Sequence, residues 1–245
     1  MNTASEFKTK ISGIYKYRIE LHAHTAPISR CSQIEPEEMV KIYSEKGYDA
    51  VVITNHFTYD EVEFCGLDKD AFLKRYTDNY EEVKAHGEKY GINVFLGAEI
   101  RFAENHNDYL LYGVNTEVLS KCYDYLLKGI EAFRTEVTLP DTVFLQAHPF
   151  RDGMEAVDPK LLDGIEIFNM HPGHNSRVGI ATRYAYESNL SIKTIGSDFH
   201  HKNHGHEAVS ALRTSVMPKD SFELAKILRS GDYLFEVGEN SIVIP

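Results

Sequence analysis

The 245-residue sequence predicts an α/β fold, because segments with the pattern of buried strands alternate with segments of helical periodicity. Seven such strands are recognisable, and most of them end in a histidine, an aspartate or a glutamate. Barrel enzymes place their active sites at the carboxyl ends of parallel strands, so this pattern favours a barrel. No glycine-rich phosphate or dinucleotide turn follows the first strand to support an open sheet. We therefore expect a single domain over residues 1–245, a distorted (β/α)7 barrel of the TIM type.

The first strand is expected at residues 18–25, after a polar leader. Side chains of a strand alternate between its faces, so Glu20, His22 and His24 should project to the same side. Imidazole is a common metal ligand, and two histidines at this spacing can reach one ion. The pair alone is a weak signal, because short motifs also arise by chance.

The later elements follow the same alternation. Further strands are expected at residues 49–56, 93–99, 108–113, 142–149, 164–169 and 192–198. A helix should begin at Pro36, which suits the first helical position, and should end at Gly47. Apolar residues at helical spacing predict three more helices, at 72–90, 119–133 and 181–186. We interpret the aromatic stripe of the helix 72–90 as core packing.

Composition narrows the classes of function. A formal net charge of −11 opposes loose binding to nucleic acid, which depends on a basic surface. The sequence has no apolar run long enough to span a bilayer, and residues 1–6 form no basic and then apolar leader, so we expect a cytoplasmic protein. The three cysteines are odd in number and far apart, which indicates neither a disulfide framework nor a cysteine-based zinc site.

Ligand-type side chains gather at the predicted strand ends. A single strand-end histidine is more often structural than catalytic, but eight coordinating groups at one rim would crowd each other with little mutual stabilisation. Six of these groups end strands, and two lie just beyond the sixth and seventh strands. They are His22, His24, His56, Glu99, His148 and Asp198, followed by His174 and His200. The constellation predicts a site for more than one metal ion.

Six short motifs, in this order, resemble those of the polymerase and histidinol phosphatase (PHP) superfamily. They are Leu-His-Ala-His-Thr at 21–25, Ile-Thr-Asn-His at 53–56, Gly-Ala-Glu at 97–99, Ala-His-Pro at 147–149, Glu-Ile-Phe-Asn at 166–169 and Gly-Ser-Asp-Phe-His at 196–200. The resemblance covers about residues 17 to 205, and the whole series is far more specific than any one motif. It implies a distorted seven-unit barrel and a phosphoesterase site with two or three divalent transition metal ions, such as zinc, manganese or iron.

The resemblance also implies how the ligands are shared. The first metal would be held by His22, His24, Glu99 and Asp198. Glu99 would bridge to a second metal held by His148 and His174, and a third metal would be held by His56 and His200. Asp198 and His200 are in addition candidates to steer protons in catalysis. In the loop after the sixth strand, His171 is the rival to His174 as the ligand, and would otherwise support a ligand by hydrogen bonding.

The chain departs from the family pattern near the third metal. Glu20 and Asn55 stand where the family usually has aspartate, although neither position is a usual ligand. The residue that normally completes the third site lies in the loop after His24, which here contains Arg30 and Cys31. A guanidinium has no free lone pair, so Arg30 would bring a fixed cation instead of a ligand. Cys31 could coordinate as a thiolate, while an ordinary loop cysteine is the simpler interpretation, and we expect the third position to be partly filled or completed by substrate phosphate.

The implied reaction is hydrolysis of a small phosphomonoester, such as histidinol phosphate or a nucleotide, by a hydroxide that bridges two metals. Arg101, Arg151 and Arg177 each follow a ligand motif and are candidates to bind phosphate oxygens, with Arg151 and Arg177 preferred. The expected partner is therefore a small phosphorylated metabolite, and the oligomeric state stays open.

Two other functions are compatible with a histidine-rich site. The first is hydrolysis of another bond, such as an amide, but no strand-end lysine is present to bridge metals after carboxylation. The second is a metal-binding module without turnover, which would be expected to have lost ligands, whereas the first two ligand sets are complete in the sequence.

Overall fold

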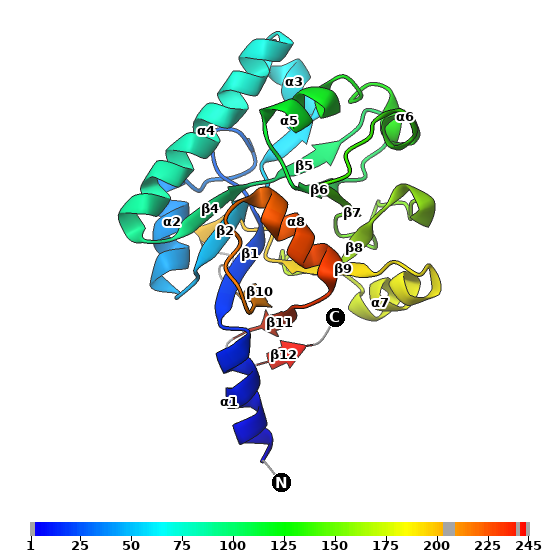
Figure 1. Ribbon diagram of the computed structural model, residues 1–245. Helices are drawn as coiled ribbons and strands as arrows, with labels where there is room; N and C mark the ends of the chain where they lie inside the picture. The colour runs from blue at the N-terminus through cyan, green and yellow to red at the C-terminus, as the bar shows by residue number, and fades with distance from the viewer. Residues whose placement is uncertain (1–2, 203–208, 239–240, 244–245) are drawn as a thin grey trace.

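The chain folds into two mixed β-sheets with helices around them (Figure 1). The computed structural model describes residues 3–202, 209–238 and 241–243. The first sheet has the strand order β12 (Ser241–Val243), β11 (Leu234–Val237), β10 (Ser210–Thr214), β1 (Tyr17–Ala23), β2 (Ala50–Ile53) and β4 (Asn93–Leu96). The second has the order β3 (His56–Thr58), β5 (Ala98–Arg101), β6 (Tyr109–Tyr112), β7 (Val143–Gln146), β8 (Gly164–Asn169) and β9 (Ile192–Gly196). The predicted α/β class is confirmed.

The helices of the described residues lie outside the sheets. They are α1 (Ala4–Ile14), α2 (Pro36–Glu45), α3 (Tyr59–Cys65), α4 (Lys69–Tyr90), α5 (Thr116–Tyr123), α6 (Gly129–Glu136), α7 (Val178–Glu187) and α8 (Ser221–Ser230), with a 3₁₀ turn at Pro159–Leu161. In Figure 1, α1 extends away from the rest of the chain, and α2 and α4 pack side by side.

The described strands do not close into a single barrel. The predicted strands 49–56 and 93–99 each divide in two, and their halves belong to different sheets, with β2 and β4 in the first and β3 and β5 in the second. In addition, β6 runs antiparallel to both β5 and β7, whereas all strands of a (β/α) barrel are parallel. The expectation of a barrel therefore holds for the alternation of strands and helices but not for closure of the sheet.

Gly97 is the residue at which the chain leaves the first sheet and enters the second. A Cβ atom at this position would lie 2.9 Å from Val52 Cγ1 and 3.0 Å from Thr54 Cγ2. Only a residue without a side chain allows this close approach. The Gly97 amide still donates to the Ile53 carbonyl oxygen at 2.9 Å, so the ladder with β2 continues to the point where the chain changes sheets.

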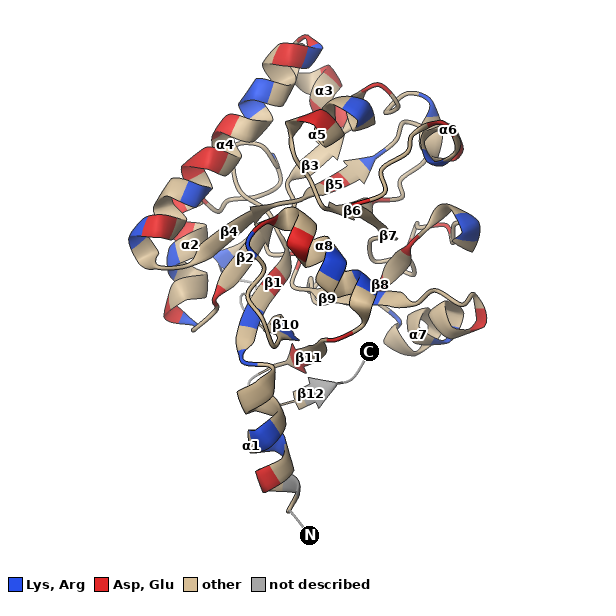
Figure 2. Ribbon diagram, viewed as in Figure 1, with Lys and Arg blue, Asp and Glu red and all other residues tan. Residues whose placement is uncertain are grey.

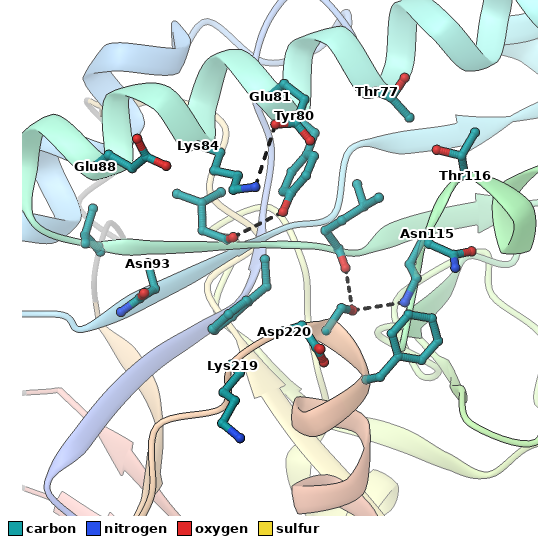
Figure 3. Close-up of a pocket in the computed structure, with 17 residues that line it drawn as sticks. Thr77, Tyr80, Glu81, Lys84, Glu88, Asn93, Asn115, Thr116, Lys219 and Asp220 are labelled. Atoms are coloured by element: carbon teal, nitrogen blue, oxygen red, sulfur yellow. Dashed lines mark hydrogen bonds and ion pairs between the residues drawn. The ribbon is translucent and has the colours of Figure 1, made fainter.

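At the outer edge of β4, the last residue of the strand is bonded by a side chain instead of another strand. The Ser221 hydroxyl at the start of α8 donates to the Leu96 carbonyl oxygen at 2.6 Å and accepts from the Val114 amide at 3.0 Å (Figure 3). A groove of about 450 Å³ lies beside this contact, between α4, β4 and the start of α8 (Figure 3). None of the eight candidate metal ligands lines that groove.

The two sheets meet where β1 and β9 end. Ala23 pairs with Phe199 in an isolated parallel bridge, and the His24 amide donates to the Phe199 carbonyl oxygen at 3.1 Å. The Asp198 amide donates to the His22 carbonyl oxygen at 2.8 Å. These bonds bring the ends of the first and last predicted strands together, so that ligand-type residues far apart in the sequence come to one place.

Two helices agree closely with the sequence prediction. Pro36 is the first residue of α2, and Gly47 follows its end with a φ of +73°. Gly91 caps α4 with a φ of +71°, a left-handed conformation that glycine adopts readily. The predicted helix 119–133, by contrast, is divided into α5 and α6 by turns, although the apolar residues at helical spacing, Leu119, Cys122, Leu126, Ile130 and Phe133, are all buried.

The aromatic stripe of α4 packs into the core as predicted, with Phe72 and Tyr76 buried. The outer face of α4 carries both signs of charge along its length (Figure 2). None of the described helices has both the length and the apolar character needed to cross a membrane.

Elements near both ends of the chain were not predicted. The polar leader forms α1, whose start carries a capping box in which Thr3 and Glu6 bond each other's backbone amides. The Thr-x-x-Glu spacing is a recognisable helix-start signal that the prediction did not use. After residue 205, β10 pairs antiparallel with β1, and β11 and β12 extend the sheet.

Replacement of Gly97 by alanine is expected to lower the free energy of unfolding by about 1–3 kcal/mol, because the new methyl group overpacks against Val52 and Thr54. The matched control is Gly13→Ala in α1, where a Cβ meets nothing within 4 Å and where alanine favours the helix. Urea unfolding of both variants measures the effect. Equal stability of Gly97→Ala and the wild type would show that the sheet change does not require glycine.

Candidate metal centre

A cavity of about 170 Å³ opens beside the ends of β5, β7 and β9. It is lined by Cys31, His56, Glu99, Arg101, Asp108, His148, Arg151, His171, His174, Asp198, His200 and His201. Six of the eight candidate ligands are therefore in the lining, and the other two, His22 and His24, are fully buried next to it. The residues that the sequence analysis selected from strand ends are thus close to one another.

Four side chains point nitrogen or oxygen atoms at a common position. The His22 Nε2 atom lies 3.4 Å from both Glu99 Oε1 and Asp198 Oδ1, and the His24 Nε2 atom lies 3.5 Å from Glu99 Oε2 and 3.2 Å from Asp198 Oδ1. A tetrahedral ion with bonds of about 2.1 Å separates its ligand atoms by about 3.4 Å. Neither Nε2 atom has a hydrogen-bond partner among the described residues, although both are buried. This geometry fits a metal ion.

A second group shares the two carboxylates with the first. The His148 Nε2 atom lies 3.1 Å from Glu99 Oε1, and the His174 Nδ1 atom lies 3.2 Å from Asp198 Oδ2. Ligand atoms of His148, His174 and Asp198 all lie within 4.8 Å of one another. Glu99 and Asp198 are therefore placed between two histidine groups, as a bridging carboxylate would be.

His174 fits this second group better than its rival His171. The ring of His171 stacks on that of His174 with centroids 4.2 Å apart, and its Nδ1 atom accepts a hydrogen bond from the Gly173 amide at 3.1 Å. His171 lines the cavity but belongs to none of the groups with ligand spacing among the described residues. The geometry favours His174 as the ligand.

A third group consists of His24, His56 and His200, whose ligand atoms also lie within 4.8 Å of one another. Cys31 lies beside it, with Sγ 3.9 Å from His56 Nδ1. The expectation that Arg30 brings a cation to this place is wrong. Its Nε atom donates to both carboxylate oxygens of Glu61, at 2.8 and 2.9 Å, and its guanidinium lies over the Phe64 ring, so Arg30 does not line the cavity.

Two candidate ligands have strained backbones. His148 has a φ of +30° and Asp198 a φ of +52°, values that residues other than glycine rarely adopt. The His148 conformation is held by its amide, which donates to Glu166 Oε2 at 2.9 Å, and that of Asp198 by the bond to the His22 carbonyl oxygen. Such strain persists only where surrounding contacts enforce it, and it is concentrated at functional sites.

Glu166 is a functional candidate that the sequence analysis missed. It is buried, and its carboxylate contacts His22 Nδ1 at 2.8 Å, the His148 amide and Asn169 Nδ2 at 3.0 Å. Because a carboxylate only accepts, the hydrogen of His22 is on Nδ1, which leaves Nε2 free to bind a metal. A Cβ atom on Gly196 would lie 2.6 Å from Glu166 Oε1, so glycine is needed beside this contact. The signal available in the sequence was Glu166 itself, a single carboxylate within the apolar strand 164–169.

The three candidate arginines are arranged differently. Arg101 lines the cavity and forms a two-bond pair with the buried Asp108, at 2.7 and 2.8 Å. Arg151 also lines the cavity, with its Nη1 atom 2.9 Å from His174 Nε2. Arg177 lies outside the lining, where its guanidinium binds the Phe150 carbonyl oxygen and Asp152. The structure thus brings Arg101 and Arg151 to the site, and Asp108 is a second buried carboxylate that the sequence analysis did not select.

The charges of the buried histidines and carboxylates in the candidate metal centre offset one another. Burial lowers the pKa of His22, but Glu166, Asp198 and Glu99 outweigh it and raise that pKa well above its ordinary value. Burial raises the pKa of Glu99, whereas the charge of His22 and hydrogen bonds from histidines hold it well below its usual range. A metal at His22 would have to displace a proton, so its binding should weaken as the pH falls.

The thiol of Cys31 shares this environment. Burial raises its pKa, but hydrogen bonds with His200 and His56 lower it to about 6. Among the described cysteines only Cys31 is exposed, since Cys65 is half-buried and Cys122 is buried.

The chain is similar to known proteins in both sequence and fold. The model of the PHP domain matches residues 20–195, which is more than half of the chain. A two-domain protein from Bacteroides vulgatus that contains a predicted PHP-like metal-dependent phosphoesterase has a TM-score of 0.62 and 15% identity, over 91% of this chain and 65% of that one. This chain thus spans just under two thirds of the Bacteroides protein.

Two further structures are similar. PsfC from Pseudomonas syringae has a TM-score of 0.52 and 17% identity, over 80% of each chain. A protein from Bifidobacterium adolescentis, whose assignment as a metal-dependent phosphoesterase is itself a prediction, has a TM-score of 0.53 and 16% identity, over 86% of this chain and 95% of that one. At these identities the likeness concerns the fold alone. No curated protein matches the chain.

Replacement of Glu166 by glutamine is expected to weaken metal binding by about 10–100-fold. The amide can accept through one oxygen only, so either His22 Nδ1 or the His148 amide would face a donor. Calorimetric titration of chelator-treated protein with Mn²⁺ or Zn²⁺ measures the affinity, and the exposed Glu82→Gln in α4 is the matched control. Unchanged affinity in a folded Glu166→Gln protein would contradict a positioning role for Glu166.

Proposed function

Because the chain belongs to the PHP domain family, we propose that it is a metal-dependent phosphoesterase that hydrolyses small phosphomonoesters. The observation that carries the proposal is the position of Glu99 between the two groups. Its Oε1 atom lies 3.4 Å from His22 Nε2 of the first group and 3.1 Å from His148 Nε2 of the second, and its Oε2 atom lies 3.5 Å from His24 Nε2 of the first. A carboxylate shared between histidine groups is the arrangement that two adjacent metal ions require.

The ligand roles follow the three groups of side chains. The first ion would be held by His22, His24, Glu99 and Asp198, the second by Glu99, His148 and His174, and the third by His56 and His200. Bound there, divalent ions would lower the pKa of a water so that it attacks phosphorus, and would offset the charge on the phosphoryl oxygens.

The chain's own cations would bind the phosphate group. Arg101 and Arg151 line the cavity, and their guanidinium forks suit phosphate oxygens. The buried Asp108 holds Arg101 through two bonds and lies 3.9 Å from Arg151, so one carboxylate orients both cations. Arg177 is the weaker candidate, because it is bound to Phe150 and Asp152 outside the cavity.

Asp198 and His200 are proposed to handle protons. The His200 Nδ1 atom lies 2.8 Å from the Asp198 carbonyl oxygen and therefore donates to it, which leaves Nε2 as the nitrogen that faces the cavity. Burial lowers the pKa of His200, but the Asp198 carboxylate and Cys31 raise it overall. When the third metal position is empty, a protonated His200 would be a candidate donor to the leaving oxygen.

Substrate size is the second part of the proposal. A cavity of about 170 Å³ admits a phosphoryl group with a small leaving group, and a net charge of −11 opposes a polyanion outside the site. We propose a small phosphorylated metabolite such as histidinol phosphate or a nucleoside monophosphate as the substrate.

The protein is expected to hydrolyse phosphomonoesters only when metal is present. Chelator-treated protein is assayed against a panel of monoesters and single-stranded DNA, with Mn²⁺, Zn²⁺ or Fe²⁺ restored singly and in pairs. Elemental analysis should find at least two ions per active chain, because two ligand groups share Glu99. Faster cleavage of the DNA, or full activity with one ion or none, would overturn the assignment.

His148→Ala and Asp198→Ala are each expected to lower kcat more than about 100-fold, since losing a ligand should cost more than losing a partner of a ligand. The matched control is His106→Ala, which removes an exposed histidine. Steady-state kinetics at saturating metal give the change, and urea unfolding verifies that the variants fold. Activity within tenfold of the wild type in either variant would count against the ligand roles.

A further inference from the structure

The loop between β1 and α2 fixes the position of Cys31 from both sides. The buried Ser29 hydroxyl contacts His24 Nδ1 at 3.0 Å and accepts from the His56 amide at 2.9 Å. The buried Ser32 hydroxyl donates to the His24 carbonyl oxygen at 2.9 Å. The loop is also tied to the segment that follows β9 by the Gln33 amide, which donates to the carbonyl oxygen of His200 at 3.0 Å. Cys31 is therefore held next to the third histidine group by anchored neighbours.

The imidazole rings of His56 and His200 are oriented so that each has one nitrogen atom that can bind a metal ion beside Cys31. His56 Nε2 lies 3.0 Å from Glu99 Oε2, so Nδ1 is the atom turned toward Cys31, at 3.9 Å from Sγ. His200 uses Nδ1 to bond the Asp198 carbonyl oxygen, so Nε2 is available. Zinc bonds of about 2.3 Å to sulfur and about 2.1 Å to nitrogen place tetrahedral ligand atoms about 3.6 Å apart. The observed separation is close to that value.

The charged side chains around Cys31, His56 and His200 also favour the binding of a cation. Arg30, the residue before Cys31, is turned away to Glu61 and Phe64. Glu99 contacts His56, and Asp198 contacts His200 at 3.3 Å, so carboxylates lie behind both imidazoles. Cys31, His56 and His200 line the same cavity, and the buried Nε2 atom of His24 beside them has no hydrogen-bond partner among the described residues.

We propose that Cys31 is a thiolate ligand that, with His56 and His200, binds the third metal ion of the centre. The inference rests on the proposed function for the presence of metal, and it adds a sulfur ligand to a site otherwise made of nitrogen and oxygen. On binding, the S–H bond of Cys31 is replaced by a sulfur–metal bond and the proton passes to solvent. Thiolate biases this position toward zinc over manganese, whereas the first two positions carry no such bias.

Cobalt substitution tests the proposal directly. The chelator-treated full chain is titrated with Co²⁺, and a thiolate ligand is expected to add a sulfur-to-cobalt charge-transfer band in the near ultraviolet. Cys31→Ser should lose the band and bind one ion fewer per chain, while the control Cys65→Ser keeps both. An unchanged band in Cys31→Ser, or no band in the wild type, would overturn the proposal.

A measurement on the wild type avoids reliance on a variant. A thiol-specific reagent should modify Cys31 at least about tenfold more slowly after metal is bound, because the thiolate is then coordinated. Equal rates with and without metal would overturn the ligand role. The phosphoesterase assignment is judged separately: hydrolysis without a charge-transfer band refutes only the Cys31 ligand, and a band without hydrolysis refutes only the enzyme activity.

Discussion

The hydrogen bond from the Asp198 amide to the His22 carbonyl oxygen joins the two sheets beside the isolated bridge between Ala23 and Phe199. It places a carboxylate from the end of β9 against a histidine pair from the end of β1. The buried Glu20 carboxylate links the same two segments, because it accepts hydrogen bonds from the amides of His22, at 3.0 Å, and Ser197, at 3.1 Å. Burial raises the pKa of Glu20, and these bonds partly offset that rise. The centre therefore depends on a seam of backbone contacts between β1 and β9, in addition to its ligand side chains.

The side chains around the seam form a balanced set of buried charges. Glu99, Asp198 and Glu166 surround histidines in a region that excludes solvent, and an unpaired charge there would be strongly destabilising. Either protons on the histidines or bound metal ions can supply the positive charge that these carboxylates need. Metal binding therefore replaces protons by metal ions. Glu166 contributes from outside the cavity, because it orients the ring of His22 and holds the strained backbone of His148.

Local patterns explain which parts of the fold were predictable. Pro36, Gly47 and Gly91 act through their own backbone preferences, so α2 and the end of α4 follow from the sequence. Strand-end ligands could be selected because parallel strands of one layer end on one side. The division of two strands at Asn55 and Gly97 could not be predicted, since it depends on how closely other strands approach.

Three features of the site were missed for the same reason: Asp108, Glu166 and the true partner of Arg30. Each is defined by a contact with residues distant in the sequence or across a loop. His171 and His174 lie in an irregular loop, where spacing predicts no direction.

The strands and the helix after residue 205 have a consequence for how the molecule can be divided. β10 pairs with the edge of β1, and Ser221 of α8 bonds the last carbonyl oxygen of the edge strand β4, yet both lie beyond the residues that match the family model. A fragment cut at residue 195 would leave the edge of β1 that pairs with β10 open, and such edges readily pair with other chains and aggregate. The portion of the chain that carries the family signature is therefore smaller than the portion that builds the first sheet.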